Sequence, residues 1–262
     1  MHILDQIVRY KKKEIEQRKK QTSVADLQQM KFYTKDCLSV VDQFEKRPKN
    51  IIAEFKRKSP SKPDINLKAD LKEKLISYQE AGASAVSVLT DHHFFGGNLS
   101  DLQIAKQELS IPILQKDFII DEYQVHEAKA YGADFILLIA RLLTIAEVQH
   151  LSTLAQDLGL EVLVEVHHED ELMKTNFTSI NLIGVNNRNL ENFEISIANS
   201  LNLAGKIPPE FVKVSESGIQ NRAQIDELYQ AGFEGFLIGE ELMKSKSVAE
   251  KISQLIGQKF SL

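Results

Sequence analysis

The sequence predicts an α/β protein whose parallel strands close into a (β/α)8 barrel, and three observations support this fold class. From residue 50 onward, short apolar runs alternate with segments in which apolar residues recur near positions i, i+3, i+4 and i+7. The apolar runs number eight, and most are continuous, as expected for parallel strands covered on both faces. No G-x-G-x-x-G motif follows the first run, which disfavours an open dinucleotide-binding sheet. A TIM barrel is therefore expected.

The predicted elements follow one another in alternation along the chain. The strands are expected at residues 50–55, 85–89, 112–115, 134–139, 161–166, 182–186, 211–215 and 235–239. The helical segments between them include residues 67–81, 99–109, 121–131, 144–158 and 221–231. Eight such units within about 210 residues fit a parallel sheet with right-handed crossovers.

Four helix-to-strand junctions resemble one another, at residues 78–89, 128–139, 155–166 and 228–239. Each carries a glycine where the helix ends, namely Gly82, Gly132, Gly159 and Gly232. A glycine at this place predicts a left-handed residue that ends the helix two or three positions before the next strand. The repeated junction favours a closed barrel built from similar units.

Residues 1–48 differ from the rest because they are basic and amphipathic and lack strand signals. We expect them to form helices that pack across one end of the barrel. This helical extension belongs to a single domain, so residues 1–262 are expected to form one barrel domain.

Composition excludes several classes of protein. The net charge of −5 offers no overall attraction for nucleic acid or an anionic membrane, so any affinity for an anion must be local. A single cysteine, Cys37, excludes an internal disulfide and suits a reducing compartment. The first residues lack an apolar signal core, and no apolar run approaches the length of a membrane span. A soluble cytoplasmic protein is expected.

Residues 51–61, IIAEFKRKSPS, begin as an apolar strand and end in a cluster of charges and hydroxyls. Pro60 and Pro63 prevent a regular element from continuing, so the charges should lie on a loop. A lone basic turn usually faces water. Glu54, however, lies within the strand pattern, where an unpaired carboxylate is costly to bury, and this favours a functional role for the segment.

Polar side chains gather where the predicted strands end, which is where such barrels build their active sites. They are Glu54 and Lys56 at strand one, Lys116 and Asp117 after strand three, Glu165 at strand five, Asn186 and Arg188 at strand six, Glu216 and Ser217 after strand seven, and Gly239 at strand eight. Taken alone, each of these residues can have a purely structural role, for example as a paired carboxylate in the core or a cation at the rim. Their agreement over six strands indicates a functional site.

The last two strand ends predict an anion site. Gly218 and Gly239 lie where backbone N–H groups can approach an anion closely, and the loops after strands seven and eight commonly bind phosphate in this architecture.

Opposite charges elsewhere on the rim predict proton transfer, since burial and partners can tune a lysine and a glutamate into an acid and a base. Lys116 with Glu165 is the preferred pair, and Glu54 with Lys56 is a second. Apolar residues near the same ends can line a slot for an aromatic ring, although core filling explains each of them equally well: Phe94, Phe95, Phe118, Leu137 and Leu190.

Two adjacent histidine pairs, at residues 92–93 and 167–168, look like metal ligands but fit no zinc-binding helix pattern. Neighbouring residues at a strand end point to opposite faces, so both members of a pair cannot easily reach one ion. We expect no metal.

The chain resembles the indole-3-glycerol-phosphate synthase family. The resemblance rests on runs that cover essentially the whole chain in family order: IIAEFKRKSPS (51–61), SVLTD (87–91), LQKDFII (114–120), ADFILLIARLL (133–143), LVEVHHEDEL (163–172), IGVNNRNLENFEI (183–195), VKVSESGI (212–219) and FLIGEELM (236–243). The E-x-K-R-x-S-P-S and LQKDF runs are the specific ones, because barrel relatives share only the phosphate loops.

The resemblance implies a reaction and roles for the residues. The substrate would be 1-(2-carboxyphenylamino)-1-deoxyribulose 5-phosphate, converted into indole-3-glycerol phosphate, carbon dioxide and water without metal or organic cofactor. Lys116 would be the acid, Glu165 the base and stabiliser of the cationic intermediate, and Glu54 an aid to dehydration. Lys56 would contact anionic groups of the substrate, including the phosphate, and can also be an acid; the resemblance leaves the division between the two lysines open.

The remaining implied roles concern binding. Asn186 would act with the catalytic set, and the substrate and its phosphate would contact Arg188, Glu216, Ser59, Ser217, Phe118, Leu137, Leu190, Gly218, Gly239 and Glu240. Some members of the family have serine in place of Glu240, and we expect the glutamate side chain to turn away and leave only its N–H for the phosphate.

Two other functions stay open from the sequence. One is another phosphosugar barrel enzyme, such as phosphoribosylanthranilate isomerase, although Glu54, Lys56 and Lys116 together argue against it. The other is a barrel that binds a phosphorylated ligand without turnover. The chain is too short for a fused synthase–isomerase. We expect a monomer or weak homodimer that can associate with other tryptophan-pathway enzymes.

Overall fold

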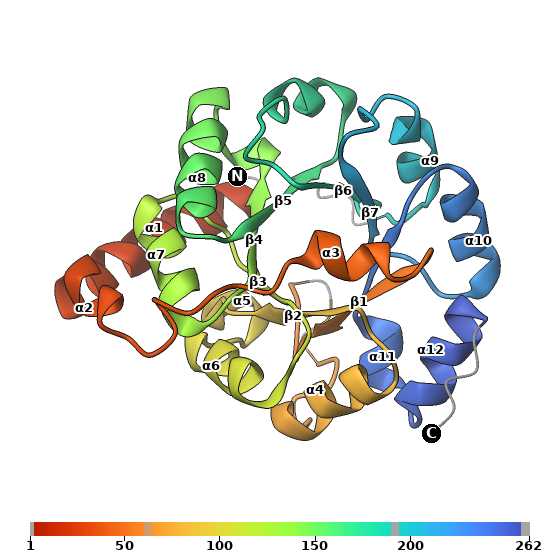
Figure 1. Cartoon of the computed structure of the whole chain (residues 1–262), viewed down its shortest axis with the longest axis horizontal. Coiled ribbons are helices and arrows are strands. Elements are labelled where there is room, and N and C mark those ends of the chain that lie inside the picture. The colour runs from red at the N-terminus through yellow and green to blue at the C-terminus, as the bar shows by residue number, and fades with distance from the viewer. Residues whose placement is uncertain (1–2, 61, 63, 190–193, 258–262) are drawn as a thin grey trace.

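The computed structural model describes residues 3–60, 62, 64–189 and 194–257, and its centre is a closed barrel of parallel strands (Figure 1). Each strand pairs with the next in sequence, and the eighth pairs with the first. The strands are β1 (Asn50–Phe55), β2 (Ala85–Leu89), β3 (Ile113–Lys116), β4 (Phe135–Ile139), β5 (Glu161–Val166), β6 (Leu182–Asn186), β7 (Val212–Glu216) and β8 (Gly235–Ile238). The predicted (β/α)8 barrel is confirmed.

Helices surround the strands on the outside of the barrel (Figure 1). They are α4 (Leu71–Glu80), α5 (His92–Phe95), α6 (Leu99–Glu108), α7 (Glu122–Tyr131), α8 (Ile145–Asp157), α9 (Ala198–Ala204), α10 (Arg222–Gln230), α11 (Glu240–Lys244) and α12 (Val248–Ile256), with short 3-10 helices η1 (Ala140–Leu142) and η2 (Glu169–Lys174). The largest boundary difference is at α4, which was expected from residue 67. The Asp70 side chain accepts a hydrogen bond from Glu73 N and so fixes the later start.

The four repeated glycines adopt the predicted left-handed backbone. Their φ angles are 86° at Gly82, 94° at Gly132, 75° at Gly159 and 95° at Gly232. A residue with a Cβ is strained in this conformation, which explains why the same residue type ends four helices.

The core has two layers, because the strands are buried on both faces. An inner layer fills the barrel with side chains such as Ile52, Leu114 and Leu163, and a larger outer layer packs between strands and helices. The continuous apolar runs in the sequence reflect this burial on both faces.

The helical extension consists of α1 (Ile3–Gln21), α2 (Val24–Gln28) and α3 (Val40–Glu45), and it contacts both ends of the barrel. In Figure 1, α3 crosses the barrel end that faces the viewer. There Phe44 belongs to the inner core and lies against Gly235, where an added Cβ would be 2.6 Å from its ring.

At the other end, Lys11 of α1 forms ion pairs with Asp91 and Asp117, which follow β2 and β3. The expectation that the extension packs across one end was therefore only partly right. A buried charge on α1, which pattern alone did not distinguish from its exposed neighbours, determines the second contact.

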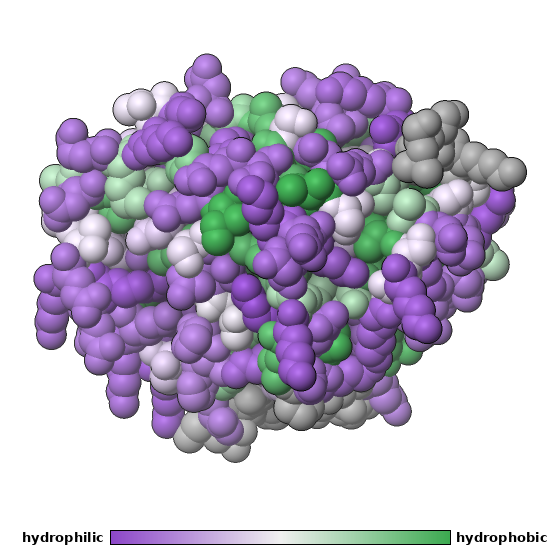
Figure 2. Space-filling model, turned by 90° about the horizontal axis from the view of Figure 1, so that it is seen from below, coloured by the Kyte–Doolittle hydropathy of each residue, from purple (hydrophilic) through white to green (hydrophobic). Residues whose placement is uncertain are grey.

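One face of the molecule, shown in Figure 2, is mostly hydrophilic, with apolar side chains in small separate groups. Within the described ranges, no helix has the length and apolar character needed to cross a membrane.

Candidate active site

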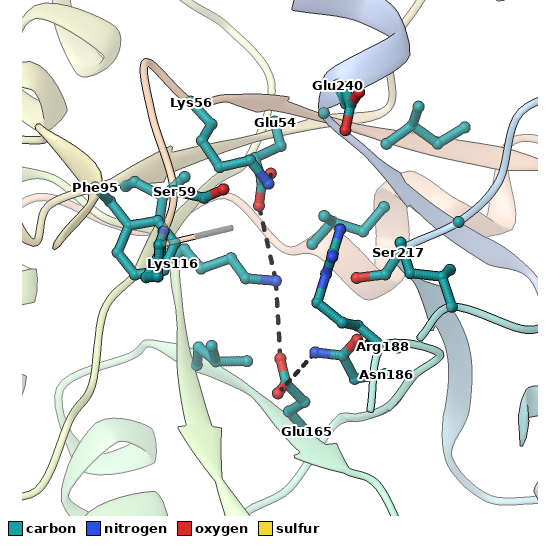
Figure 3. Close-up of a pocket in the computed structure, with 18 of the residues that line it drawn as sticks. Glu54, Lys56, Ser59, Phe95, Lys116, Glu165, Asn186, Arg188, Ser217 and Glu240 are labelled. Atoms are coloured by element: carbon teal, nitrogen blue, oxygen red, sulfur yellow. Dashed lines mark hydrogen bonds and ion pairs between the residues drawn. The ribbon is translucent and has the colours of Figure 1, made fainter. Parts of the chain in front are cut away.

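A cavity of about 260 Å³ opens at the carboxyl ends of the strands (Figure 3). Most of the side chains that the sequence predicted for the site line it together: Glu54, Lys56, Ser59, Phe95, Lys116, Phe118, Leu137, Glu165, Asn186, Arg188, Ser217, Gly218, Gly239 and Glu240. Two described members of the predicted set, Glu216 and Phe94, do not line the cavity, and Leu190 lies outside the described residues.

Lys116 lies among three carboxylates at the centre of the site. Its Nζ is 2.5 Å from Glu216 Oε2 and 3.8 Å from both Glu54 Oε1 and Glu165 Oε2. The structure thus brings together the preferred pair, Lys116 and Glu165, as well as the carboxylate of the second pair. Figure 3 shows the line from Glu54 through Lys116 to Glu165.

These carboxylates decide the protonation state of the lysine. Burial alone would lower the pKa of Lys116, but Glu216 first, and then Glu54 and Glu165, raise that pKa above its usual value. The lysine therefore stays protonated at neutral pH, as a general acid must before it reacts.

Glu216 is fully buried behind Lys116, so it contacts the lysine and not the cavity. Burial raises the pKa of Glu216 to about 7, with Lys116 opposing the rise and Glu165 adding to it. Gly184 of β6 makes room for this side chain, because a Cβ there would lie 2.2 Å from Glu216 Oε1. A direct contact with substrate, which the resemblance implied, stays a prediction.

Glu54 and Lys56 form the second charge pair, with Lys56 Nζ 2.5 Å from Glu54 Oε2. Burial works to raise the pKa of Glu54, but Lys56 and then Lys116 outweigh it and lower that pKa. Glu54 is consequently an ionised base at neutral pH. Gly239 leaves space for it, since a Cβ at Gly239 would be 2.4 Å from Glu54 Oε2.

Asn186 and Lys116 contact different oxygens of the Glu165 carboxylate. Asn186 Nδ2 donates a hydrogen bond to Glu165 Oε1 at 3.1 Å, while Glu165 Oε2 faces Lys116. Asn186 Oδ1 in turn accepts a hydrogen bond from the backbone N of Arg188 at 2.9 Å. Figure 3 shows the Arg188 side chain between Lys116 and Ser217, within the cavity.

The loop after β7 has an unusual backbone at Ser217 and Gly218, with φ angles of 68° and 79°. Ser217 is the one described residue other than glycine with a positive φ. Such strain persists where the surrounding structure requires it, often at functional sites. At Gly218 a Cβ would lie 2.2 Å from Ile195 Cγ2, so glycine is needed for space as well as for conformation.

Glu240 lines the cavity, and its carboxylate pairs with Lys62 of the loop after β1 and with Lys244 of its own helix. Partial burial works to raise the pKa of Glu240, but hydrogen bonds from Lys244 and Lys62 outweigh it and lower that pKa to about 2. Two lysines thus hold the carboxylate, and the expectation that only the N–H of Glu240 serves the phosphate stays a prediction.

Sequence reasoning missed several residues of the cavity wall, among them Leu4, Ile7, Lys62, Leu89, Ile139 and Ile195. Leu4 and Ile7 come from α1, so the helical extension contributes to the site itself. Their spacing marks one face of an amphipathic helix, but such a face indicates burial without naming the partner.

The two histidine pairs have other surroundings. Tyr10 stacks on His93 with ring centroids 4.3 Å apart, and His167 lies between Glu165 and Glu171. Among the described residues, no group of three His, Cys, Asp or Glu side chains is arranged to hold a metal ion.

Comparison with solved structures shows the fold. A chain of the tryptophan synthase complex from Pyrococcus furiosus covers 80% of this chain and 98% of its own, with a TM-score of 0.59 and 16% identity. The 3-hexulose-6-phosphate synthase from Salmonella typhimurium covers 79% of this chain and 96% of its own, with a TM-score of 0.62 and 10% identity.

Comparison with sequences shows the family. The family model described as indole-3-glycerol phosphate synthase matches residues 4–255. The indole-3-glycerol phosphate synthase of Bacteroides thetaiotaomicron is 44% identical over 254 residues, covering 97% of each chain. That of Koribacter versatilis is 47% identical over 207 residues, covering 79% of this chain and 80% of its own. That of Campylobacter jejuni strain RM1221 is 39% identical over 258 residues, covering 97% of this chain and 100% of its own. This chain belongs to the indole-3-glycerol phosphate synthase family.

Proposed function

We propose that this protein is an indole-3-glycerol phosphate synthase, a carboxy-lyase that closes the indole ring of 1-(2-carboxyphenylamino)-1-deoxyribulose 5-phosphate. The observation that carries the proposal is the charge arrangement of the cavity, in which one protonated lysine lies among three carboxylates. The family membership supplies the substrate.

The first step forms a carbon–carbon bond. The ring carbon that bears the carboxylate attacks the ribulose carbonyl carbon, and the carbonyl electron pair moves to oxygen, which takes a proton from Lys116. The ring becomes cationic, and Glu165 with its ionised neighbours stabilises that charge. Because Lys116 Nζ and Glu165 Oε2 are 3.8 Å apart, both groups can reach the same reacting centre.

The second and third steps restore aromaticity. The bond to the carboxylate breaks, its electron pair returns to the ring, and carbon dioxide leaves. The new hydroxyl then departs as water after protonation by a lysine, while a carboxylate removes the proton from the neighbouring carbon. Glu54 and Lys56, 2.5 Å apart, are suited to this dehydration as base and acid.

The phosphate would lie beside the loops after β7 and β8. Backbone N–H groups of Gly218, Gly239 and Glu240 are the proposed donors, and the left-handed backbone at residues 217–218 supports this assignment. The charged side chain of Lys56 is a further candidate. Binding the phosphate away from the reacting atoms supplies energy for holding the flexible sugar in place.

The remaining proposed contacts orient the substrate. Asn186 and Arg188 would hold its hydroxyls and carboxylate, with Ser59 and Ser217 as hydroxyl donors. Phe118 and Leu137 would line the aromatic slot, where Phe118 lies 5.9 Å from Phe95 between ring centroids. Glu216 would hold Lys116 in place, and the resemblance implies that it also helps to orient the substrate.

Indole fluorescence tests the proposal directly. The protein contains no tryptophan, so product formation can be followed continuously against a low background. We expect indole emission to rise when the folded protein is mixed with 1-(2-carboxyphenylamino)-1-deoxyribulose 5-phosphate. Tight substrate binding without emission would indicate a non-catalytic barrel, and conversion of phosphoribosylanthranilate instead would indicate an isomerase.

A further inference from the structure

His167 is the first residue after β5 and lies on the same side as Glu165, two positions earlier, because side chains two apart along a strand point the same way. Its side chain is only 4% exposed. The ring stands between two carboxylates, with Nε2 3.5 Å from Glu165 Oε1 and Nδ1 3.9 Å from Glu171 Oε2. It therefore lies behind a proposed catalytic base, away from the substrate.

Both ring nitrogens are buried, and neither forms a hydrogen bond with the described residues at normal distance. A buried polar atom without a partner is costly and calls for an explanation. Burial lowers the pKa of His167 to about 4, although Glu171 and Glu216 oppose this and only His168 and Arg141 assist it. The imidazole is therefore neutral at neutral pH.

A neutral imidazole has one N–H and one lone pair, so it can donate to only one of its two carboxylates at a time. Glu171 already accepts a hydrogen bond from the backbone N of His167 at 2.7 Å, and this bond fixes its position. When Glu165 is ionised, the favourable tautomer carries its proton on Nε2, toward Glu165. When Glu165 has taken up a proton, its hydroxyl can donate to Nε2, and the ring proton belongs on Nδ1.

We propose that His167 is a positioning residue for Glu165: it holds Glu165 Oε1 together with Asn186, and its tautomer follows the protonation of that carboxylate. Asn186 and His167 both approach Oε1, which leaves Oε2 facing Lys116 and the reacting centre. The histidine thus stabilises the base both before and after proton uptake. This inference deepens the proposed function and depends on it for the role of Glu165.

Nitrogen NMR of the imidazole rings tests the coupling without substrate. In protein labelled with 15N-histidine, the His167 signals are assigned by their loss in His167→Gln. At neutral pH we expect the Nε2–H tautomer in wild type and the Nδ1–H tautomer in Glu165→Gln, because the amide N–H of glutamine can donate to Nε2. The same tautomer in both proteins would overturn the proposal.

Kinetics provide the second test, with exposed His168→Phe as the matched control. We expect His167→Phe to lower kcat by up to about a hundredfold, the cost of a misplaced catalytic group, while KM stays within about threefold. His167→Gln, which keeps a donor, should recover part of this loss. Equal kcat values for His167→Phe and His168→Phe, measured on folded protein, would refute the positioning role. An inactive wild type whose tautomer nevertheless differs from that of Glu165→Gln would instead contradict the proposed function.

Discussion

Two buried lysines in this protein have similar partners but different surroundings. Lys116 lies among Glu54, Glu165 and Glu216, and Lys11 lies among three other carboxylates, those of Glu14, Asp91 and Asp117. The side chain of Lys116 is 16% exposed at the cavity, whereas that of Lys11 is completely buried between α1 and the barrel.

The distances show why only one of them is suited to chemistry. All three contacts of Lys11 are between 2.8 and 2.9 Å, so its charge is fully engaged by the protein. Lys116 has one contact at 2.5 Å and two at 3.8 Å, and it lines the cavity, so a ligand can approach its Nζ. Lys11 joins the helical extension to the barrel, whereas Lys116 borders the cavity and is the proposed proton donor.

The largest expected effect comes from removing a carboxylate that lies 3.8 Å from Lys116. We expect Glu165→Gln to lower kcat by about a thousandfold, within the range for a general base, because the amide can neither accept the proton nor stabilise a cation. Initial rates of indole fluorescence measure this. Retention of more than a tenth of the wild-type kcat would show that another carboxylate is the base.

Breaking the tight cluster should affect stability. Lys11→Met leaves Asp91 and Asp117 buried without their cation, and we expect it to lower the free energy of unfolding by about 3 to 5 kcal/mol. Urea titration measures the change, with Lys13→Met on the exposed face of α1 as control. If the two variants are equally stable, the buried cluster does not hold the extension in place.

Glu216→Gln should move the alkaline limit of activity. In the proposed mechanism Lys116 is the acid, so activity should be lost as pH rises through its pKa, and Glu216 raises that pKa. Removing this charge should shift the limit to lower pH by about one unit or more. The measurement is kcat from about pH 7 to the highest pH at which both proteins stay folded, because the pKa of Lys116 lies above its usual value. An unchanged alkaline limb would mean that Lys116 is not the titrating acid.

The smallest expected effect is at Glu240, where exposed ion pairs contribute little. Glu240→Ser releases Lys62 and Lys244 beside the proposed phosphate site, so we expect KM to fall about two- to threefold with kcat within about twofold. Lys244→Met serves as the comparison, because it removes one of the two lysines that pair with Glu240 and leaves the carboxylate in place. A hundredfold loss of kcat in Glu240→Ser would show that the carboxylate takes part in the reaction.

The barrel could be predicted from sequence because local signals agree at each unit. Strands β1, β2, β5 and β6 have the predicted bounds, since mostly continuous apolar runs mark strands that are buried on both faces. Strands β3 and β7 each continue one residue further than predicted, to Lys116 and Glu216. Those two charges pair with each other across the barrel, a tertiary contact that no local pattern reveals.

Site residues at the ends of strands could be predicted from the sequence. Residues that the helical extension contributes could not. Glu54, Lys116 and Glu165 follow from barrel geometry, because strand ends of parallel strands meet at one edge. Lys11, in contrast, lies in the run YKKKEIEQRKK, where its neighbours are exposed and look the same. Its partners are at least eighty residues away in Asp91 and Asp117, and only the fold identifies them.

The most direct test of the account is a single turnover by Lys116→Met beside wild type, each first shown by titration calorimetry to bind the substrate. We expect indole emission from wild type and, at matched saturation, a rate lower by at least about a thousandfold from Lys116→Met. Emission from the variant at more than a tenth of the wild-type rate would contradict the assignment of this lysine as the acid.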